Sequence, residues 1–137
     1  KIVLVKKMDT RNINVITLAY LGDAIYEVYI RKHLIEKGIA LVDDLQKEAV
    51  KYVSAKNQSR ILKWLEDKDI FKEEEIDIIK RGRNYKRGSH PKNTDIITYK
   101  NSTGFEALIG YLYLEKENDR IDELMKLILE EFYEKNI

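Results

Sequence analysis

The chain contains a single proline, Pro91, and only six glycines among its 137 residues. Because these two residue types most often interrupt helices and form turns, their scarcity favours long helices over many short elements. Apolar residues recur at helical spacing, and no convincing segment alternates apolar and polar residues as a strand would. The sequence therefore predicts an all-α fold of about six to seven helices, formed by a single domain over residues 1–137.

Residues that favour helix ends divide the chain into expected helices. Asn14 opens the first helix, which ends near Glu36 and is followed by Gly38. The remaining expected features are a capping box at Asp43 and Gln46, a helix start at Ser54, a helix over 72–81 stopped by Gly82, an irregular stretch over about 83–95, a helix over about 98–116 and a last helix capped by Asn118.

The composition excludes several classes of protein. There is no cysteine, so disulfide scaffolds, zinc ribbons and thiol nucleophiles are absent. No apolar run approaches the roughly 20 residues that a membrane-spanning helix needs, and the opening apolar segment at residues 1–5 is too short for a signal peptide. We therefore expect a cytoplasmic protein without a membrane partner.

Positive charge is concentrated in one segment. The formal net charge is only +1, but the residues from Lys80 to Lys100 contain seven bases and one acid, which gives +6 and leaves −5 for the rest of the chain. A basic segment on an acidic body indicates an anionic partner. A solvated basic loop without a partner would have the same composition, so charge alone leaves both interpretations open.

Two carboxylates lie in helices that are otherwise almost uncharged. Between Asn14 and Ile30 the only charged residues are Asp23 and Glu27, and apolar residues surround the helical wheel, which predicts a deeply buried helix. Glu106 lies in a similar, nearly uncharged run. An ionised carboxylate in such a place is costly unless a cation or hydrogen-bond donors accompany it.

A glycine lies close to each of these carboxylates. Gly22 precedes Asp23, and Gly110 follows Glu106 by one helical turn. Glycine costs about 1 kcal/mol inside a helix but lets two backbones approach closely, so the two helices can cross here and bring the carboxylates together. Alternatively, each carboxylate is solvated or paired in a salt bridge, and spacing alone does not decide between these interpretations.

The residues around the two carboxylates resemble motifs of the ribonuclease III family. The family's signature helix resembles the segment LAYLGDA at residues 18–24, and its second catalytic motif resembles FEALIG at residues 105–110. The resemblance extends to residues 53–56, 80–84 and 91–95 and covers about residues 14–116. By position, Asp23 and Glu106 match the aspartate and glutamate that hold the catalytic metal in the family.

The sequence also departs from the family pattern. Ile16 and Ala19 replace glutamates of the signature helix, and Thr103 replaces an aspartate of the second motif. The chain ends directly after the last expected helix, so we expect no double-stranded-RNA-binding domain. In this reduced form it resembles the Mini-III ribonucleases, which are stand-alone catalytic domains of the superfamily.

The resemblance implies an activity and its requirements. It implies a metal-dependent endoribonuclease that cleaves double-stranded RNA, leaves 5′-phosphate and 3′-hydroxyl ends, and matures the ends of large-subunit (23S) ribosomal RNA precursor. Asp23 and Glu106 are the expected catalytic residues and the expected ligands of Mg²⁺, for which Mn²⁺ can substitute. The implied partners are RNA and a second copy of the chain, and a ribosomal protein on the substrate stays an open question.

The implied homodimer needs an interface. The first helix is apolar and rich in tyrosine, with Tyr20, Tyr26 and Tyr29, and is expected to supply part of that interface. The alternative is that these rings belong to the core of the monomer.

Without a separate binding domain, the catalytic body has to contact the RNA itself. Duplex RNA is recognised mainly through phosphates and 2′-hydroxyls, so the basic segment is the predicted contact. Its expected RNA ligands are Arg81, Arg83, Asn84, Lys86, Arg87, His90 and Lys92. The other histidine, His33, is expected to be an ordinary residue near the end of the first helix.

Two other functions are compatible with parts of the sequence. A catalytically silent dimeric RNA-binding factor for ribosome assembly would explain the acids missing at positions 16, 19 and 103, and a magnesium-dependent cleavage assay on duplex RNA separates it from an enzyme. A helical domain that binds DNA or protein would bind no RNA and would leave Asp23 solvated.

Overall fold

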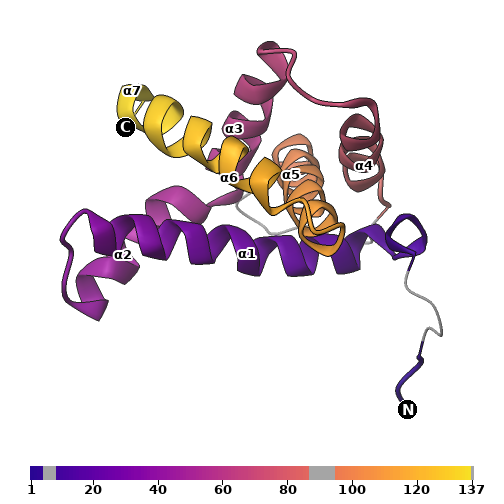
Figure 1. The fold of residues 1–137 in the computed structure, drawn as a ribbon, viewed down its shortest axis with the longest axis horizontal. Helices are drawn as coiled ribbons and strands as arrows, with labels where there is room; N and C mark the ends of the chain where they lie inside the picture. The colour runs from indigo at the N-terminus through magenta and orange to yellow at the C-terminus, as the bar shows by residue number, and fades with distance from the viewer. Residues whose placement is uncertain (5–8, 87–94, 137) are drawn as a thin grey trace.

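The computed structural model describes residues 1–4, 9–86 and 95–136, and over these residues the fold is all-helical (Figure 1), which confirms the predicted fold class. The elements in chain order are η1 (Thr10–Asn12), α1 (Val15–Glu36), α2 (Val42–Val53), α3 (Ala55–Asp67), α4 (Glu73–Arg83), α5 (Ile96–Leu114), α6 (Asn118–Leu127), the π-helical segment η2 (Ile128–Phe132) and α7 (Tyr133–Asn136).

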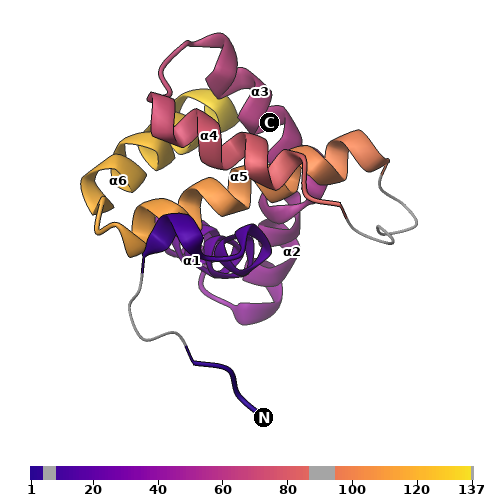
Figure 2. The ribbon, with the colours of Figure 1, turned by 90° about the vertical axis from the view of Figure 1, so that its right-hand side faces the viewer.

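The helix α5 lies at the centre of the fold. It packs against α1, α3, α4 and α6, and Figures 1 and 2 show these helices arranged around it. Its sequence explains this position, because every residue from Asn101 to Leu112 except Glu106 is buried. A helix that is apolar or small on all sides is covered by neighbours on all sides.

The helix α1 runs past α5 and buries only one of its faces, so the prediction of a deeply buried first helix is wrong. The buried residues are Val15, Leu18, Ala19, Gly22, Tyr26, Ile30 and Leu34. On the outer side, Tyr20, Val28 and Ile35 are 83%, 61% and 57% exposed. The apolar wheel of α1 therefore combines a face that packs on the core with an apolar face that points outward.

Several helix ends lie where their capping residues predict them. The side chain of Asn14 accepts a hydrogen bond from the backbone N–H of Ile16 at 2.8 Å, and α1 follows directly. Ser54 accepts from the N–H of Asn57 at 3.2 Å at the start of α3. Gly38 follows the end of α1 with a φ of +99°, a conformation that favours glycine.

Other helix ends differ from the prediction. The helix α2 begins at Val42, so Asp43 lies in its first turn and forms no capping box with Gln46. Asp95 caps α5 by accepting from the N–H of Thr98 at 2.9 Å, which starts that helix earlier than expected. Asn118 is the first residue of α6, and Glu117 is its cap. Boundaries are commonly uncertain by one or two residues, but the shift at α5 has an identifiable cap as its cause.

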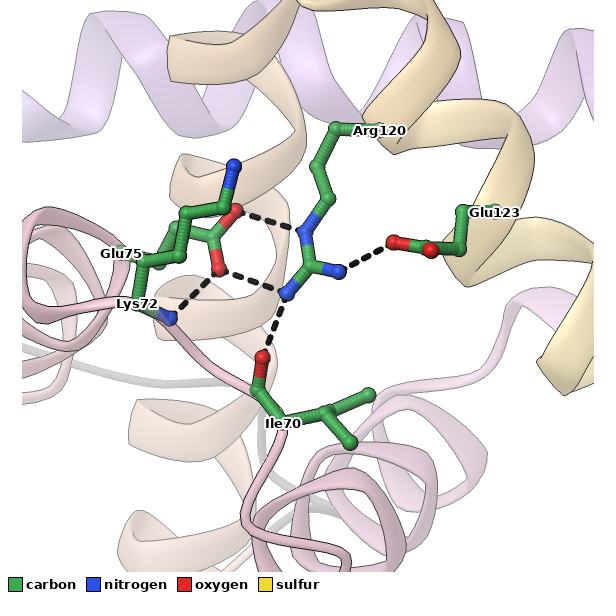
Figure 3. Close-up of polar contacts among 5 residues, drawn as sticks. All are labelled: Ile70, Lys72, Glu75, Arg120 and Glu123. Carbon is green, nitrogen blue, oxygen red and sulfur yellow. Dashed lines mark hydrogen bonds and ion pairs between the residues drawn. The ribbon is translucent and has the colours of Figure 1, made fainter.

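A buried ion pair joins α4 to α6 (Figure 3). The guanidinium of Arg120 donates to both carboxylate oxygens of Glu75 at 2.9 Å and to the carbonyl oxygen of Ile70 at 2.7 Å, and it also contacts Glu123. Glu75 additionally accepts from the N–H of Lys72 at the start of α4. These contacts, with Glu75 first, raise the pKa of Arg120 above its ordinary value, so the guanidinium stays charged within the protein.

In the described part of the chain, no helix combines the length and the apolar character needed to cross a membrane.

Candidate active site

The helices α1 and α5 cross in backbone contact at two glycines. A Cβ atom on Gly22 would lie 1.7 Å from the carbonyl oxygen of Glu106, and a Cβ atom on Gly110 would lie 1.9 Å from the carbonyl oxygen of Leu18. Neither distance is possible for a real side chain, so only glycine permits this approach. The two helices thus cross where the sequence places its glycines.

Asp23 and Glu106 come to this crossing from different helices. Asp23 directly follows Gly22, and the backbone of Glu106 is the one that Gly22 faces. Since consecutive Cα atoms are about 3.8 Å apart, the backbone positions that carry the two carboxylates are neighbours. The side chain of Glu106 is partly buried, whereas Asp23 is exposed. Spacing left open whether Asp23 is solvated, and the structure shows that it is, so no desolvation cost marks this carboxylate.

The donor atoms at the crossing suit a hard divalent cation. Carboxylate oxygens are ligands that Mg²⁺ prefers, usually one or two of them together with water and substrate phosphate. Within residues 1–4, 9–86 and 95–136, no group of three or more histidine, aspartate and glutamate side chains is arranged to hold a metal ion. The two carboxylates therefore fit an ion completed by water and substrate, and the described part of the chain provides no larger protein cage.

The positions where the family carries further acids have structural roles in this chain. Ala19 is buried on the core face of α1, and Ile16 packs partly against the core. Thr103 is 6% exposed, and its hydroxyl donates to the carbonyl oxygen of Tyr99 at 3.0 Å, one turn earlier in α5. None of these side chains supplies a carboxylate to the crossing.

Gln58 of α3 is a contact of Glu106 that sequence reasoning missed. It is 1% exposed, its Nε2 donates to Oε2 of Glu106 at 3.5 Å, and its Oε1 accepts from the hydroxyl of Ser102. A signal was present, because Gln58 lies at helical spacing on the same stripe as Ile61, Leu62 and Leu65. An amide on an apolar stripe indicates a specific polar partner.

A second polar contact between α3, α4 and α5 involves a residue predicted to bind RNA. Arg83 donates through Nε to Asn101 at 2.8 Å and through its terminal nitrogen to Glu66 at 3.1 Å. Asn101 in turn donates to the hydroxyl of Ser59 at 3.1 Å. The guanidinium of Arg83 thus has partners within the fold that its place in a basic run does not reveal.

The other predicted RNA ligands differ in their surroundings. Arg81 donates to the carbonyl oxygens of Arg11 and Ile13, both at 3.0 Å, and so ties α4 to the segment before α1. Asn84 and Lys86 follow α4 and are exposed. The remaining predicted ligands, Arg87, His90 and Lys92, lie outside the described residues.

His33 lies in the last turn of α1, as expected. Its Nε2 is buried and has no hydrogen-bond partner among the described residues, and the ring packs edge-on against Tyr52. Burial, followed by the nearby charge of Lys37, lowers the pKa of this histidine.

Comparison with known proteins decides the family. A family model described as the Ribonuclease III domain matches residues 16–117, which include the helix crossing and both carboxylates. The chain belongs to the ribonuclease III family. The predicted family is thereby confirmed, and so is the predicted class of enzyme, since this is a family of endoribonucleases.

Curated relatives carry one common name within this family. The chain is 45% identical to the Mini-ribonuclease 3 of Streptococcus pneumoniae over 118 residues, which are 86% of this chain and 92% of the relative. It is 48% identical to the Mini-ribonuclease 3 of Brevibacillus brevis over 118 residues, again 86% of this chain and 87% of the relative. These matches confirm the resemblance to the Mini-III ribonucleases.

A solved structure supports the same conclusion. The fold is similar to the crystal structure of a protein from Fusobacterium nucleatum, with a TM-score of 0.79 and 34% sequence identity. The similarity covers 90% of this chain and 98% of that protein. The helices that form the crossing therefore belong to a fold shared over nearly the whole length.

Proposed function

We propose that this ribonuclease III family member is a metal-dependent endoribonuclease that cleaves double-stranded RNA, with Asp23 and Glu106 as its catalytic residues and metal ligands. The observation that carries the proposal is the α1–α5 crossing, where Gly22 packs on the backbone of Glu106 and Asp23 follows directly. This contact fixes the spacing of the two residues through the backbone, independently of how the side chains rotate.

The chemistry assigns different tasks to the two side chains. Asp23 is exposed and can meet an ion that arrives with its substrate, whereas Glu106 is partly buried and held from one side by Gln58. A bound Mg²⁺, or Mn²⁺ in its place, would activate water for in-line attack and offset the charge that develops at the scissile phosphate. Hydrolysis of this kind would leave a 5′-phosphate and a 3′-hydroxyl.

The RNA contact proposed for this protein begins where α4 ends. Arg81 and Arg83 lie at the start of the basic segment and donate hydrogen bonds to Arg11, Glu66 and Asn101. In the proposal, the exposed Asn84 and Lys86 lead the contact with phosphates and 2′-hydroxyls. Arg87, His90 and Lys92 continue it along the chain.

The relatives that bear the name Mini-ribonuclease 3 support a ribonuclease that acts on RNA, and the resemblance to the Mini-III ribonucleases implies which RNA. We propose that the RNA is the precursor of large-subunit (23S) ribosomal RNA, processed in the cytoplasm, with a ribosomal protein as a candidate partner on the substrate. Two protomers related by a two-fold axis would place one site on each strand of the duplex.

In the proposed dimer, the tyrosines of α1 have different roles. Tyr26 is fully buried and its hydroxyl contacts the carbonyl oxygen of Tyr52, so it belongs to the monomer core. Tyr29 is partly buried and donates to Asp122 of α6. Tyr20 is 83% exposed and is the tyrosine available to a second copy.

The test is the replacement of Asp23 by Asn in a cleavage assay on duplex RNA with Mg²⁺. Because this change removes a ligand charge and almost no volume, folding and RNA binding should persist. Metal-ion catalysis contributes several kcal/mol, and each 1.4 kcal/mol is tenfold in rate, so cleavage should fall by about a thousandfold or more.

The matched control is Glu27→Gln on the same helix, one turn beyond Asp23. Glu27 pairs with Arg31 at 2.7 Å and is not part of the proposed site, so its replacement should leave cleavage unchanged. Full activity of Asp23→Asn would remove Asp23 from the mechanism. A wild-type protein that binds duplex RNA but never cleaves it would instead support the silent ribosome-assembly factor.

A further inference from the structure

Gln58 is a side chain from outside α5 that contacts the partly buried carboxylate of Glu106, and it is not part of the two motifs that resemble those of ribonuclease III. Gln58 lies on α3 between two residues of α5, with its amide nitrogen 3.5 Å from Oε2 of Glu106 and its amide oxygen in contact with the hydroxyl of Ser102. Gln58 itself is 1% exposed. Its amide therefore cannot rotate out to solvent.

The chemistry of the three groups fixes which way this amide points. An ionised carboxylate only accepts hydrogen bonds, whereas a hydroxyl can donate or accept. The NH₂ end of Gln58 must therefore face Glu106, and the hydroxyl of Ser102 must donate to its oxygen. At 3.5 Å the contact with Glu106 is at the long end of hydrogen bonding.

Core packing alone would allow an apolar residue at the position of Gln58. It lies on the same stripe of α3 as Ile61, Leu62 and Leu65, which are all fully buried. A buried amide costs free energy unless it is hydrogen-bonded, and both of its contacts lie on α5 within four residues of each other. Both ends of the amide thus contact the segment of α5 that carries Glu106.

We propose that Gln58 is a positioning residue that holds the Glu106 carboxylate in the orientation in which it shares a divalent ion with Asp23. This inference rests on the proposed function, because it assumes that Glu106 is a metal ligand. Partners that orient the ligands of a metal ion typically change metal affinity or activity by 10-fold to 100-fold when they are replaced.

The test measures binding of Mn²⁺ to the free protein by electron paramagnetic resonance, which needs no RNA and no turnover. Gln58→Met keeps the length and helix preference of the side chain and removes the amide. We expect it to weaken Mn²⁺ binding by about 10-fold or more, and to shift the Mg²⁺ dependence of cleavage to higher concentration, with the rate restored at saturating Mg²⁺.

Two serine variants form a matched pair. Ser102→Ala leaves Gln58 in place but removes the hydroxyl that fixes its amide, so Mn²⁺ binding should weaken by several-fold. Ser59→Ala removes a hydroxyl of the same α3–α5 interface that contacts Asn101 and not Gln58, so Mn²⁺ binding should stay as in the wild type. A purely structural role predicts equal effects of the two, and if Gln58→Met does not fold, this pair decides.

The outcomes separate this inference from the proposed function. If wild-type protein binds Mn²⁺ and Asp23→Asn abolishes that binding, but Gln58→Met and Ser102→Ala bind it as the wild type does, the positioning role of Gln58 is wrong and the metal site stands. If the wild type binds no Mn²⁺, or binds it independently of Asp23, the proposed function fails, and the role of Gln58 fails with it.

Discussion

The guanidinium of Arg120 shows how much a single buried charge can contribute to this fold. Its side chain is 11% exposed and that of Glu75 is 1% exposed, and the pair connects α6 to the start of α4 (Figure 3). Removing one partner of a buried pair leaves an uncompensated charge. The pair should therefore matter far more to stability than the ion pairs on the surface.

We predict that Arg120→Met lowers the free energy of unfolding by about 3–5 kcal/mol, because Glu75 is left buried without its cation. The measurement is chemical denaturation followed by circular dichroism. Lys32→Met is the control, since Lys32 and Glu36 are 72% and 64% exposed and 4.0 Å apart, so the change should stay within about 0.5 kcal/mol. Equal effects of the two variants would contradict the assignment of Arg120 as a buried structural cation.

The sequence did not reveal the partners of several individual side chains. The basic run correctly marks a concentration of positive charge, but the partner of Arg83 is Glu66 and the partner of Arg81 is the backbone before α1, about 70 residues earlier. Asp23 lies in an apolar stretch and is nevertheless exposed. Such side-chain partners depend on which helices pack together, and local spacing carries no information about them.

At the scale of helices, the α1–α5 crossing depends on the absence of two Cβ atoms. A methyl group on Gly110 would meet the backbone of Leu18 at 1.9 Å, and backbone cannot rotate away as a side chain can. The helices would have to separate, which would also move Asp23 away from Glu106. Stability and the candidate metal site are therefore coupled at this contact.

We predict that Gly110→Ala destabilises the protein by about 2 kcal/mol, because an overpacking cost of about 3 kcal/mol exceeds the roughly 1 kcal/mol that alanine gains as a helix former. Thermal unfolding measures it. The control is Gly38→Asn, because a Cβ atom on Gly38 would meet nothing within 4 Å and asparagine tolerates its positive φ. If the Gly110→Ala protein unfolded at the same temperature as the wild type, the helices would not be in contact here.

The helices themselves were largely predictable, because caps are local. Asn14 and Ser54 start helices through their own side chains, as their residue types predict. Gly82 was expected to stop a helix but lies inside α4. A Cβ atom on Gly82 would lie 2.8 Å from the Cα atom of Gly104 in α5, so its absence lets the two helices pack closely. A glycine that ends a helix and a glycine that packs between helices look alike until the neighbouring helix is known.

At the scale of the whole molecule, the proposed RNA contact has a measurable electrostatic signature. Each phosphate that a lysine or arginine neutralises contributes to the salt dependence of binding. We predict that Lys86→Gln weakens duplex RNA binding and lowers the slope of log K against log salt by about 1. Lys63→Gln, on an exposed position of α3, should leave the slope unchanged. An unchanged slope for Lys86→Gln would exclude it as a phosphate ligand.

The proposed dimer concerns the exposed apolar side of α1 and the start of α2. Tyr20, Val28 and Ile35 lie on one stripe of α1, and Leu41 and Val42 follow at 67% and 65% exposed. Exposed apolar stripes of this kind mark interaction surfaces. Tyr20 also lies one turn before Asp23, so a two-fold interface through Tyr20 would bring the two candidate sites close to the same duplex.

We predict that wild-type protein sediments as a dimer at micromolar concentration and that Tyr20→Arg sediments as a monomer. An aromatic side chain at the centre of an interface contributes about 2 kcal/mol or more, or a 30-fold change in Kd, and a buried unpaired arginine adds a further cost. Ile76→Arg is the control, because Ile76 is 39% exposed and lies on α4, outside the α1 stripe. In the monomeric variant, cleavage of one strand should no longer be accompanied by cleavage of the other. A wild-type protein that is only monomeric, or a dimer that Tyr20→Arg leaves intact, would contradict this interface.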